Sequence, residues 1–239
     1  MTELQLRRQI VATALRMNTL GINRGKSGNV SARWEDGFLV TPSGLPYEET
    51  KPGDIVFMDA MAAAKGRRAP SSEWRFHFDI YRRKSEVSAV VHAHSSFATT
   101  LACLEMAVPA FHYMVGVAGG NSIRCAPYAT FGTQTLSDNA LRALEDRNAC
   151  LLANHGMIAT GGSLGSALAL AVEVEALCEQ YWRALQIGKP TLLSDHEMEV
   201  VLEKFRTYGK ATLDGHSPRK ILHNTPLRGA QRARRKTHT

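Results

Sequence analysis

No two cysteines of this sequence lie close enough together to form a CxxC motif. The four cysteines are scattered along the chain, at Cys103, Cys125, Cys150 and Cys178. Isolated cysteines are typical of a reducing compartment, so we expect a cytoplasmic protein without thiolate metal sites. The sequence also lacks an apolar run of about 18 residues, so no membrane-spanning helix is predicted.

Acidic residues are missing from the C-terminal end of the chain. From Ser217 onward there are seven basic residues and no acidic one, which leaves 22 basic and 22 acidic residues in the rest. The net charge of +7 therefore belongs to a tail, and the globular part is neutral. Such a tail can touch polyanions weakly, but the distribution argues against specific nucleic-acid binding. We predict a folded domain over residues 1–210 and a basic, disordered tail over residues 211–239.

Hydrophobic residues make up 44% of the chain, which is enough for an ordinary buried core. Apolar residues near helical spacing predict a helix over residues 4–20, and a stretch rich in Ala, Leu and Glu predicts a longer helix over residues 163–187. Short apolar runs predict strands over residues 90–94 and 149–153. No internal repeat or linker interrupts residues 1–210, so the sequence favours one α/β domain.

Two histidines lie in the short apolar run Val90-Val91-His92-Ala93-His94. Side chains alternate between the two faces of a strand, so His92 and His94 are expected to point the same way. A single histidine in such a run would be interpreted as an ordinary core residue. Two neighbouring imidazoles suit a divalent metal with nitrogen ligands, and the pair therefore predicts a metal site.

Further ligands for such a metal are available elsewhere in the chain. His155 lies between an apolar run and a glycine, and Glu73 follows Ser71 and Ser72. Three histidines and a carboxylate are good zinc ligands, and three protein ligands with an exchangeable position are typical of a catalytic site. Spacing alone does not show that these residues converge. Ser71 or Ser72 is also a candidate N-cap for the amphipathic helix that follows, and the functional alternative is an anion bound at that helix N-terminus.

Small residues form two loops that have the composition of an anion site. The loops are Gly25-Lys26-Ser27-Gly28-Asn29-Val30-Ser31 and Thr41-Pro42-Ser43-Gly44. Their backbone N–H groups can approach an anion closely, and Asn and Ser side chains add donors. Each loop is equally consistent with a plain turn. Neither loop has the glycine spacing of a Walker motif, so nucleotide binding is not predicted.

Five short motifs follow one another in the order and spacing of a known family. They are Gly28-Asn29-Val30-Ser31, Thr41-Pro42-Ser43-Gly44, Pro70-Ser71-Ser72-Glu73-Trp74-Arg75-Phe76-His77, His92-Ala93-His94 and His155-Gly156. Over residues 1–210 the chain resembles the class II aldolase/adducin-head family, and within it the enzymes that cleave L-fuculose 1-phosphate. The resemblance implies that family's fold, a single α/β domain with a central antiparallel sheet flanked by helices.

The resemblance also implies a role for each residue that matches a family motif. Zinc would be bound, one ion per subunit and with manganese or cobalt as alternatives, by Glu73, His92, His94 and His155. The substrate phosphate would be bound by Asn29, Ser43, Gly44, Ser71 and Ser72. Tyr113 and Tyr208 would be catalytic or gating residues. The implied assembly is a homotetrameric ring with active sites at the subunit junctions.

The implied reaction is the reversible cleavage of a ketose 1-phosphate to dihydroxyacetone phosphate and an aldehyde, which is lactaldehyde for L-fuculose 1-phosphate. Breaking a C–C bond beside a ketone leaves a carbanion, which a chelated metal stabilises as an enediolate. The other route, a lysine Schiff base, needs a desolvated lysine, and the lysines here lie in polar or loop-like contexts. In cleavage Tyr113 would take the proton of the C4 hydroxyl, and Glu73 would protonate the enediolate.

Three other functions are consistent with the same motifs. A sugar-phosphate 4-epimerase would use the same bond cleavage and then re-add the aldehyde. A methylthioribulose-phosphate dehydratase would keep the three histidines but release no triose. A non-catalytic module of the adducin-head kind would be expected to lose the metal ligands, which this sequence retains. Detection of free dihydroxyacetone phosphate separates the aldolase from all three.

Overall fold

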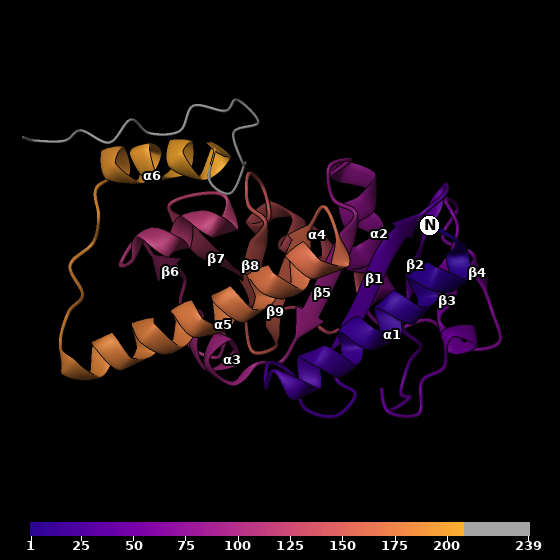
Figure 1. Cartoon of the computed structure of the whole chain (residues 1–239). Helices are drawn as coiled ribbons and strands as arrows, with labels where there is room; N and C mark the ends of the chain where they lie inside the picture. Colours follow the sequence, from indigo (N-terminus) through magenta and orange to yellow (C-terminus); the bar gives the residue numbers. More distant parts are fainter. Residues whose placement is uncertain (208–239) are drawn as a thin grey trace, which may run out of the picture. The chain divides into compact units, whose positions relative to one another are not determined.

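A nine-stranded sheet lies at the centre of the computed structural model, which describes residues 1–207 (Figure 1). In chain order the strands are β1 Asn29–Trp34, β2 Gly37–Val40, β3 Val56–Met58, β4 Ala64–Lys65, β5 Ala89–Ala93, β6 Val108–Pro109, β7 Ser122–Ala126, β8 Ala149–Leu152 and β9 Gly156–Gly161. They are ordered β4-β3-β2-β1-β5-β9-β8-β7-β6 across the sheet. Every pair is antiparallel except β7 and β8, which run parallel. The predicted α/β fold with a mostly antiparallel central sheet is confirmed.

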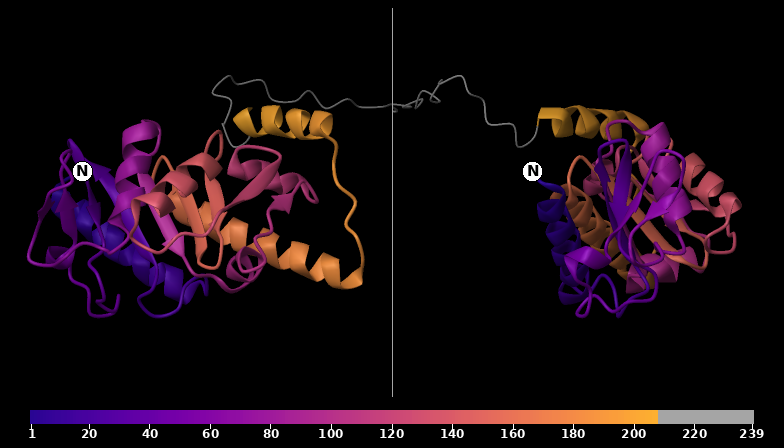
Figure 2. Two further views of the ribbon diagram at one scale, coloured as in Figure 1. Left: turned by 180° about the vertical axis from the view of Figure 1, so that it is seen from behind. Right: turned by 90° about the vertical axis from the view of Figure 1, so that its right-hand side faces the viewer.

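Helices cover both faces of the sheet, as the end-on view in Figure 2 shows. One face is covered by α1 Glu3–Thr19, α3 Ser96–Ala102 and α5 Leu164–Ile187, and the other by α2 Trp74–Arg83 and α4 Gln134–Ala143. A short 3₁₀ helix, η1 Pro52–Asp54, precedes β3, and a second, η2 Tyr113–Ala118, packs against α6 Asp195–Thr207. No helix within residues 1–207 combines the length and the apolar character needed to cross a membrane.

The central strand β5 is buried on both faces because it faces a core on each side. Val91 packs in the core beneath α1 and α5, whereas Val90 packs in the core beneath α2 and α4. Alternation along the strand then places His92 on the α2 side, where its ring lies edge-on to Phe76 of α2 at a centroid distance of 5.4 Å. The strand predicted from the histidine pair is confirmed.

The two long helices predicted from periodicity are confirmed, but the start of α2 is not where the sequence suggested. Ser163 caps α5 through a hydrogen bond from the Ser166 N–H, and α1 ends at a left-handed Gly21. The prediction that Ser71 or Ser72 caps α2 is wrong, because the N-cap residue is Glu73. Ser71 instead forms a turn in front of the helix, where its Oγ accepts a hydrogen bond from the Glu73 N–H.

Two of the predictions from the sequence concern residues outside the described part of the chain. The basic tail predicted over residues 211–239 and the catalytic role of Tyr208 both fall beyond Thr207. Residues 1–207 form one compact unit, and the predicted domain boundary at residue 210 stays a prediction.

Asp54 ties two loop segments together beside β3. Its buried carboxylate accepts hydrogen bonds from the Lys51 N–H at 2.9 Å and from Nε of Arg67 and Arg68 at 3.0 Å each. Burial opposes ionisation of this carboxyl, but the Lys51 N–H and the guanidinium groups of Arg68 and Arg67 outweigh it and lower the pKa of Asp54. The link fixes the segment that leads into Pro70.

We expect Asp54→Asn to lower the free energy of unfolding at pH 7 by about 1–2 kcal/mol. This loss is small for a buried carboxylate because the side chains of both arginines are at least half exposed, so solvent screens the ion pairs. Since the pKa of Asp54 is lower in the folded state, its contribution is present above the unfolded pKa, about 3.9, and is lost as the pH falls further. Urea unfolding of wild type and variant between pH 7 and pH 3 measures this. The exposed Asp36→Asn is the control, and a stability difference that stays constant over this range contradicts the assignment.

Candidate metal centre

Four candidate ligands meet at one end of the central strands. His92 lies near the end of β5, His94 one residue beyond it, and His155 in the turn between β8 and β9. Glu73 is the N-cap residue of α2, which lies over the face of β5 that carries His92. The convergence that spacing alone could not show is therefore present: the four residues each offer a ligand atom within 4.8 Å of the others.

Glycine allows the two ligand-bearing segments to come close together. A Cβ on Gly156, which begins β9, would lie 2.5 Å from the Ala93 carbonyl oxygen and 3.0 Å from Cδ2 of His94. A Cβ on Gly28 would lie 2.6 Å from the carbonyl oxygen of His92. The two distances to carbonyl oxygens, 2.5 and 2.6 Å, are shorter than real Cβ contacts allow, so only glycine permits this backbone spacing.

The distances within the cluster fit a single small cation. Nε2 of His92 lies 3.0 Å from Nε2 of His94 and 3.1 Å from Oε2 of Glu73, and Nε2 of His155 lies 3.0 Å from Oε1 of Glu73. Four atoms placed tetrahedrally at 2.0–2.1 Å from a zinc ion would be about 3.4 Å apart. These three contacts are slightly shorter than the ligand–ligand distances of a loaded site, and the four ligand atoms as a set lie within 4.8 Å of one another.

A hydrogen bond from Nδ1 of His92 leaves Nε2 of the same ring unprotonated, as a metal ligand must be. Nδ1 of His92 lies 2.9 Å from the carbonyl oxygen of Met157, so it carries the proton and leaves the Nε2 lone pair directed into the cluster. Oε1 of Glu73 is buried and accepts no hydrogen bond from any residue that the structure describes. An orphaned carboxylate oxygen beside imidazole lone pairs is the arrangement that a divalent cation satisfies.

The electrostatics of the site favour an ionised Glu73 and a neutral His94, whereas burial of His92 is outweighed by the Glu73 carboxylate, which raises the pKa of His92. Burial alone would raise the pKa of Glu73, but His92 and His155 outweigh it and hold this pKa well below its usual range. Burial, together with the charges of His92 and His155, lowers the pKa of His94 to about 4. An ionised carboxylate and a neutral imidazole are the forms that bind metal at neutral pH.

A buried chain of hydrogen bonds ends at the carboxylate of Glu73, and this chain was not predicted from the sequence. Nδ2 of Asn29 donates to Oε2 of Glu73 at 2.9 Å, so Oδ1 of Asn29 accepts from Nε2 of His77 at 2.5 Å. Nδ1 of His77 then accepts from Ser31 Oγ at 2.7 Å, and Ser31 accepts from the hydroxyl of Tyr81 at 2.7 Å. His77 comes one helical turn after Glu73, and that spacing was the available signal.

Each member of this chain has one defined hydrogen-bonding role. Burial, with the charge of His92, lowers the pKa of His77 to about 3, so its ring is neutral and has one donor and one acceptor. Burial also raises the pKa of Tyr81, which keeps its hydroxyl protonated. The Asn29 amide is therefore held with its NH₂ group toward Glu73.

A cavity of about 260 Å³ lies beside the cluster. Glu73, His94 and His155 line it on one side. Ser27 and Ser72 supply polar groups, and the exposed aromatic rings of Tyr128 and Phe131 supply apolar surface. The cavity thus opens directly onto three of the four candidate ligands.

Three loops that carry the predicted phosphate-binding residues are linked by hydrogen bonds. Lys26 Nζ donates to the Gly44 carbonyl oxygen at 3.0 Å, the Ser43 N–H donates to the Ala69 carbonyl oxygen at 3.1 Å, and the Ser71 N–H donates to the Thr41 carbonyl oxygen at 3.0 Å. Ser72 lines the cavity, while Ser43 and Gly44 are exposed on the neighbouring loop. Ser71 and Asn29 are buried behind Glu73. The predicted phosphate residues thus lie in adjoining loops and not all in the cavity wall.

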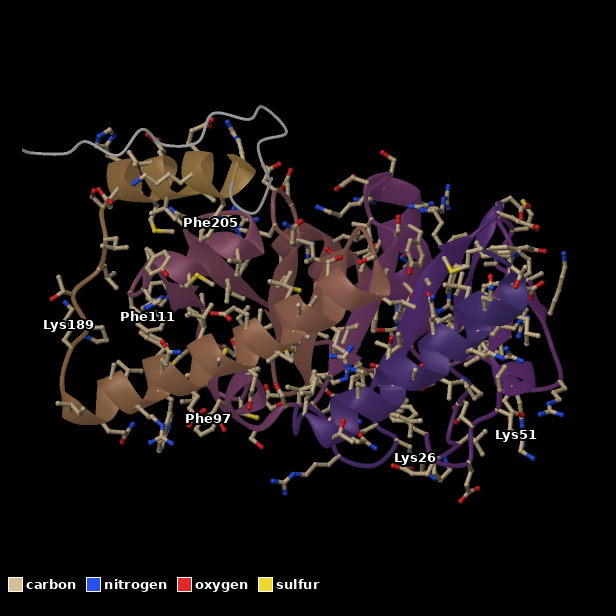
Figure 3. All side chains as sticks on the ribbon, viewed as in Figure 1. Lys26, Lys51, Phe97, Phe111, Lys189 and Phe205 are labelled. Carbon is tan, nitrogen blue, oxygen red and sulfur yellow. The ribbon has the colours of Figure 1, made fainter. Side chains whose placement is uncertain are left out.

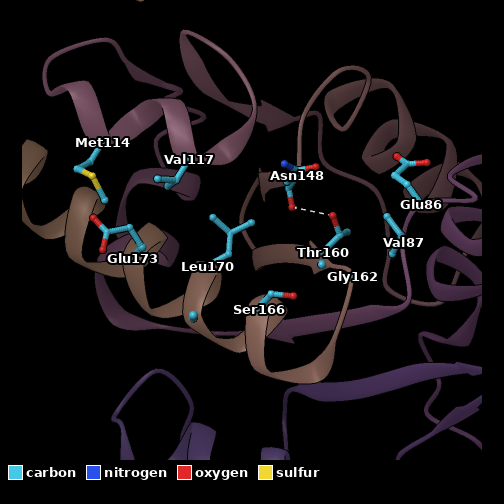
Figure 4. A pocket seen from close by; sticks show the side chains of 12 residues that line it. Glu86, Val87, Met114, Val117, Asn148, Thr160, Gly162, Ser166, Leu170 and Glu173 are labelled. Carbon is cyan, nitrogen blue, oxygen red and sulfur yellow. Dashed lines mark hydrogen bonds between the residues drawn. The ribbon is translucent and has the colours of Figure 1, made fainter. Parts of the chain in front are cut away.

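Tyr113 lies at the other end of the sheet from the cluster. It begins η2, is half exposed, and stacks on Phe205 of α6 at 6.3 Å (Phe205 is labelled in Figure 3). Met114 and Val117 of η2 line a second cavity, of about 480 Å³, together with Val87 (Figure 4). Val87 precedes β5, whereas the histidines follow at its far end, about 15 Å along the strand. Within one chain, Tyr113 does not reach the ligand cluster.

The lysines labelled in Figure 3, Lys26, Lys51 and Lys189, lie at the surface. Lys84 is largely buried, but its Nζ donates to the carbonyl oxygens of Leu144 and Arg147. No lysine among residues 1–207 lines the cavity beside the cluster. The prediction against a Schiff-base lysine stays a prediction.

Comparisons with known proteins give a consistent set of matches. The family model described as "Class II Aldolase and Adducin N-terminal domain" matches residues 8–182. A 5-methylthioribulose-1-phosphate/5-deoxyribulose-1-phosphate aldolase of Rhodospirillum rubrum is 57% identical over 208 residues, which are 87% of this chain and 94% of that protein. An L-fuculose phosphate aldolase of Escherichia coli K12 is 50% identical over 206 residues, which are 86% of this chain and 96% of that protein.

Solved structures agree with these matches. The structure of an L-fuculose 1-phosphate aldolase superposes with a TM-score of 0.82 at 39% sequence identity, and the superposition covers 84% of this chain and 96% of that one. The residues that the family model matches, 8–182, include all nine strands and the four candidate ligands.

Proposed function

The chain belongs to the class II aldolase and adducin N-terminal domain family, and from this premise we propose that it is a metal-dependent aldolase that cleaves a ketose 1-phosphate to dihydroxyacetone phosphate and an aldehyde. The observation that carries the proposal is the cluster of Glu73, His92, His94 and His155 beside a cavity lined by Ser72 and by aromatic rings. An adducin-like module without catalysis would have no use for this cluster.

The residues of the cluster have separate tasks in this reaction. A divalent metal bound by His92, His94 and His155 supplies the electron sink for the carbanion. We propose zinc, with manganese or cobalt as alternatives, because three imidazoles and a carboxylate are good zinc ligands. Glu73 holds the proton that is delivered to the carbon of dihydroxyacetone phosphate after the bond breaks, and Asn29 orients this carboxylate.

The phosphate end of the substrate is assigned to the three linked loops. Ser72 faces the cavity, and Ser43 and Gly44 lie on the loop that Lys26 and Ala69 hold in place. Asn29 donates a hydrogen bond to the Glu73 carboxylate and Ser71 Oγ accepts one from the Glu73 N–H, so these two residues lie next to Glu73. Backbone N–H groups and hydroxyls of small residues are suited to a phosphate dianion.

The aldehyde end of the substrate is assigned to Tyr128 and Phe131. Both rings line the cavity and are largely exposed, so they provide apolar surface opposite the metal ligands. The relatives act on 5-methylthioribulose 1-phosphate, 5-deoxyribulose 1-phosphate and L-fuculose phosphate. These sugars share an apolar terminus, a methyl or methylthio group. We propose a ketose 1-phosphate of this kind, with the 5-methylthio or 5-deoxy sugar ahead of L-fuculose 1-phosphate because the former relative is more similar.

Tyr113 acts in this proposal from a neighbouring subunit. The metal end of the chain carries the exposed rings of Tyr128 and Phe131, and the opposite end carries the exposed Tyr113. Head-to-tail contact between unlike ends generates a ring when the rotation between subunits closes, and such a ring would bring Tyr113 of one subunit to the cavity of the next. The predicted homotetramer with sites at subunit junctions, and the proton transfer by Tyr113 from the C4 hydroxyl, rest on this arrangement. A cytoplasmic location stays a prediction from the four free cysteines.

The test is the release of dihydroxyacetone phosphate from a panel of ketose 1-phosphates, followed with a coupled dehydrogenase. The panel contains 5-methylthioribulose, 5-deoxyribulose, L-fuculose and ribulose 1-phosphates, and the last of these has a polar terminus as the control. We expect release from the first three and a higher kcat/KM than for ribulose 1-phosphate. A methyl group placed on an apolar surface favours binding by about 1 kcal/mol or more, so about fivefold or more is expected.

Other products in this assay would indicate that the protein catalyses a different reaction. An epimerised ketose phosphate without free triose would indicate the 4-epimerase. Loss of water from 5-methylthioribulose 1-phosphate, again without triose, would indicate the dehydratase. Absence of any turnover by metal-loaded protein with the whole panel would contradict the proposal.

A further inference from the structure

Helix α3 connects two of the three histidine ligands. It begins at Ser96, two residues after His94, and ends at Ala102. The carbonyl oxygen of Ala102 accepts a hydrogen bond from the N–H of Asn154 at 3.0 Å, and Asn154 immediately precedes His155. Each end of this short helix is therefore attached to a segment that carries a ligand.

The N-terminus of α3 is capped by a residue from another helix. Ser95 occupies the N-cap position, but its side chain makes no capping hydrogen bond. Glu175 of α5 takes that place: Oε1 accepts from the Phe97 N–H at 2.8 Å, and Oε2 accepts from the Ala98 N–H at 2.8 Å. These are the N–H groups that a local N-cap side chain ordinarily satisfies. Oε2 also accepts from the Ser95 hydroxyl at 2.6 Å, so the carboxylate makes three charge-assisted bonds to residues 95–98.

The rings of His94 and His155 depend on their backbone for position. His92 is oriented by its own bond from Nδ1 to the Met157 carbonyl oxygen. Within residues 1–207, Nδ1 of His94 and Nδ1 of His155 have no such partner. His94 also lies one residue beyond the last residue of β5, so the sheet does not hold it. What holds its backbone on the C-terminal side is the Ser95–Ala98 turn bound by Glu175.

We propose that Glu175 is a positioning residue of the metal centre, which fixes the separation of His94 and His155 through α3. The inference rests on the proposed metal site. Glu175 lies on α5, on the opposite face of the sheet from Glu73, and touches neither ligand. It acts through the backbone at both ends of α3, and its loss would let the two imidazoles move apart without removing either one.

The experiment compares Glu175→Gln with a matched variant on the same helix, Glu179→Gln. Glu179 lies one turn further along α5, and within residues 1–207 its carboxylate pairs only with Arg183, at the surface. The Zn²⁺ dissociation constant is measured by competition with a chelator, and the visible absorption spectrum of the Co²⁺-loaded protein reports coordination geometry. We expect Glu175→Gln to weaken Zn²⁺ binding about 10-fold or more, the usual effect of losing a residue that orients ligands, and to change the Co²⁺ spectrum. Glu179→Gln should change neither.

A second variant keeps the test decisive if Glu175→Gln does not fold. Ser95→Ala removes one of the three bonds to the carboxylate and should weaken Zn²⁺ binding by about 2- to 10-fold. Folded variants that lose thermal stability but keep wild-type Zn²⁺ affinity and an unchanged Co²⁺ spectrum would overturn the inference. Wild-type protein that binds no Zn²⁺ would instead overturn the metal centre itself.

Discussion

Replacing His155 with alanine is expected to lower kcat for triose release by about 10³-fold or more. Charge stabilisation of a carbanion by a bound metal amounts to several kcal/mol, and each 1.4 kcal/mol is tenfold in rate. His155 is the suitable ligand to remove because it lies in a turn and its side chain is 11% exposed, whereas His92 is fully buried and bonded to Met157. The loss should therefore be in metal binding and not in folding.

Metal content measured by mass spectrometry should accompany the kinetics. We expect about one divalent metal per chain in the wild type and a much smaller content in His155→Ala after the same dialysis. His196→Ala is the control, since this histidine is exposed on α6. Full activity in His155→Ala, or in wild-type protein after exhaustive chelation, would remove the metal from the reaction.

The pair His92 and His94 could be predicted from the sequence because the relevant geometry is local. The period of a strand places alternate side chains on one face, and the backbone of β5 follows that period up to Ala93. The convergence of His155 and Glu73 with this pair could not be predicted from local geometry. Their positions depend on the pairing of β5 with β9 and on the packing of α2 over the sheet, both of which are contacts distant in sequence. The sequence offered both residues as candidate ligands, but only the family resemblance implied that they bind the same metal as the pair.

The residues that support the ligands could not be found from the sequence. Glu175 lies 80 residues from Ser95 and looks like one of several acidic residues on a long helix. His77 appeared only as part of a motif, and its bond to Asn29 depends on β1 lying beside α2. The start of α2 was also misplaced, because Ser71 uses its hydroxyl in a turn and not as a cap. In each case a contact distant in sequence, or a competing local hydrogen bond, decided the outcome.

The position of Tyr113 illustrates how the fold limits what one chain can do. The sequence resemblance assigns it a catalytic role, yet η2 packs with α6 at the strand ends opposite the histidines. A single chain therefore brings together the candidate metal ligands, Glu73 as the proposed proton carrier and the predicted phosphate loops, but not the residue that would act on the C4 hydroxyl. Catalysis that uses Tyr113 requires assembly, whereas metal binding and proton exchange at Glu73 do not.

Glu73→Gln is expected to separate metal binding from proton transfer. Glutamine keeps the shape and an oxygen that can accept from Asn29, but it cannot carry a proton between solvent and substrate. We expect exchange of the carbon-bound proton of dihydroxyacetone phosphate with D₂O, followed by NMR, to fall by about 10²-fold or more. Metal content should stay close to that of the wild type, because the three histidines remain. The carboxylate is ionised at neutral pH, since His92 and His155 hold the pKa of Glu73 well below its usual range.

The exchange reaction needs only the ketone half of the substrate, which makes it a sharper test of Glu73 than cleavage. No aldehyde is present and no C–C bond is broken. The exchange therefore does not depend on the apolar surface of Tyr128 and Phe131 or on proton transfer by an adjoining Tyr113. We expect Tyr113→Phe to slow cleavage while leaving this exchange nearly unchanged, so the two variants should differ in which reaction they impair. Metal-replete Glu73→Gln that exchanges at the wild-type rate would show that Glu73 is only a ligand and that the proton comes from elsewhere.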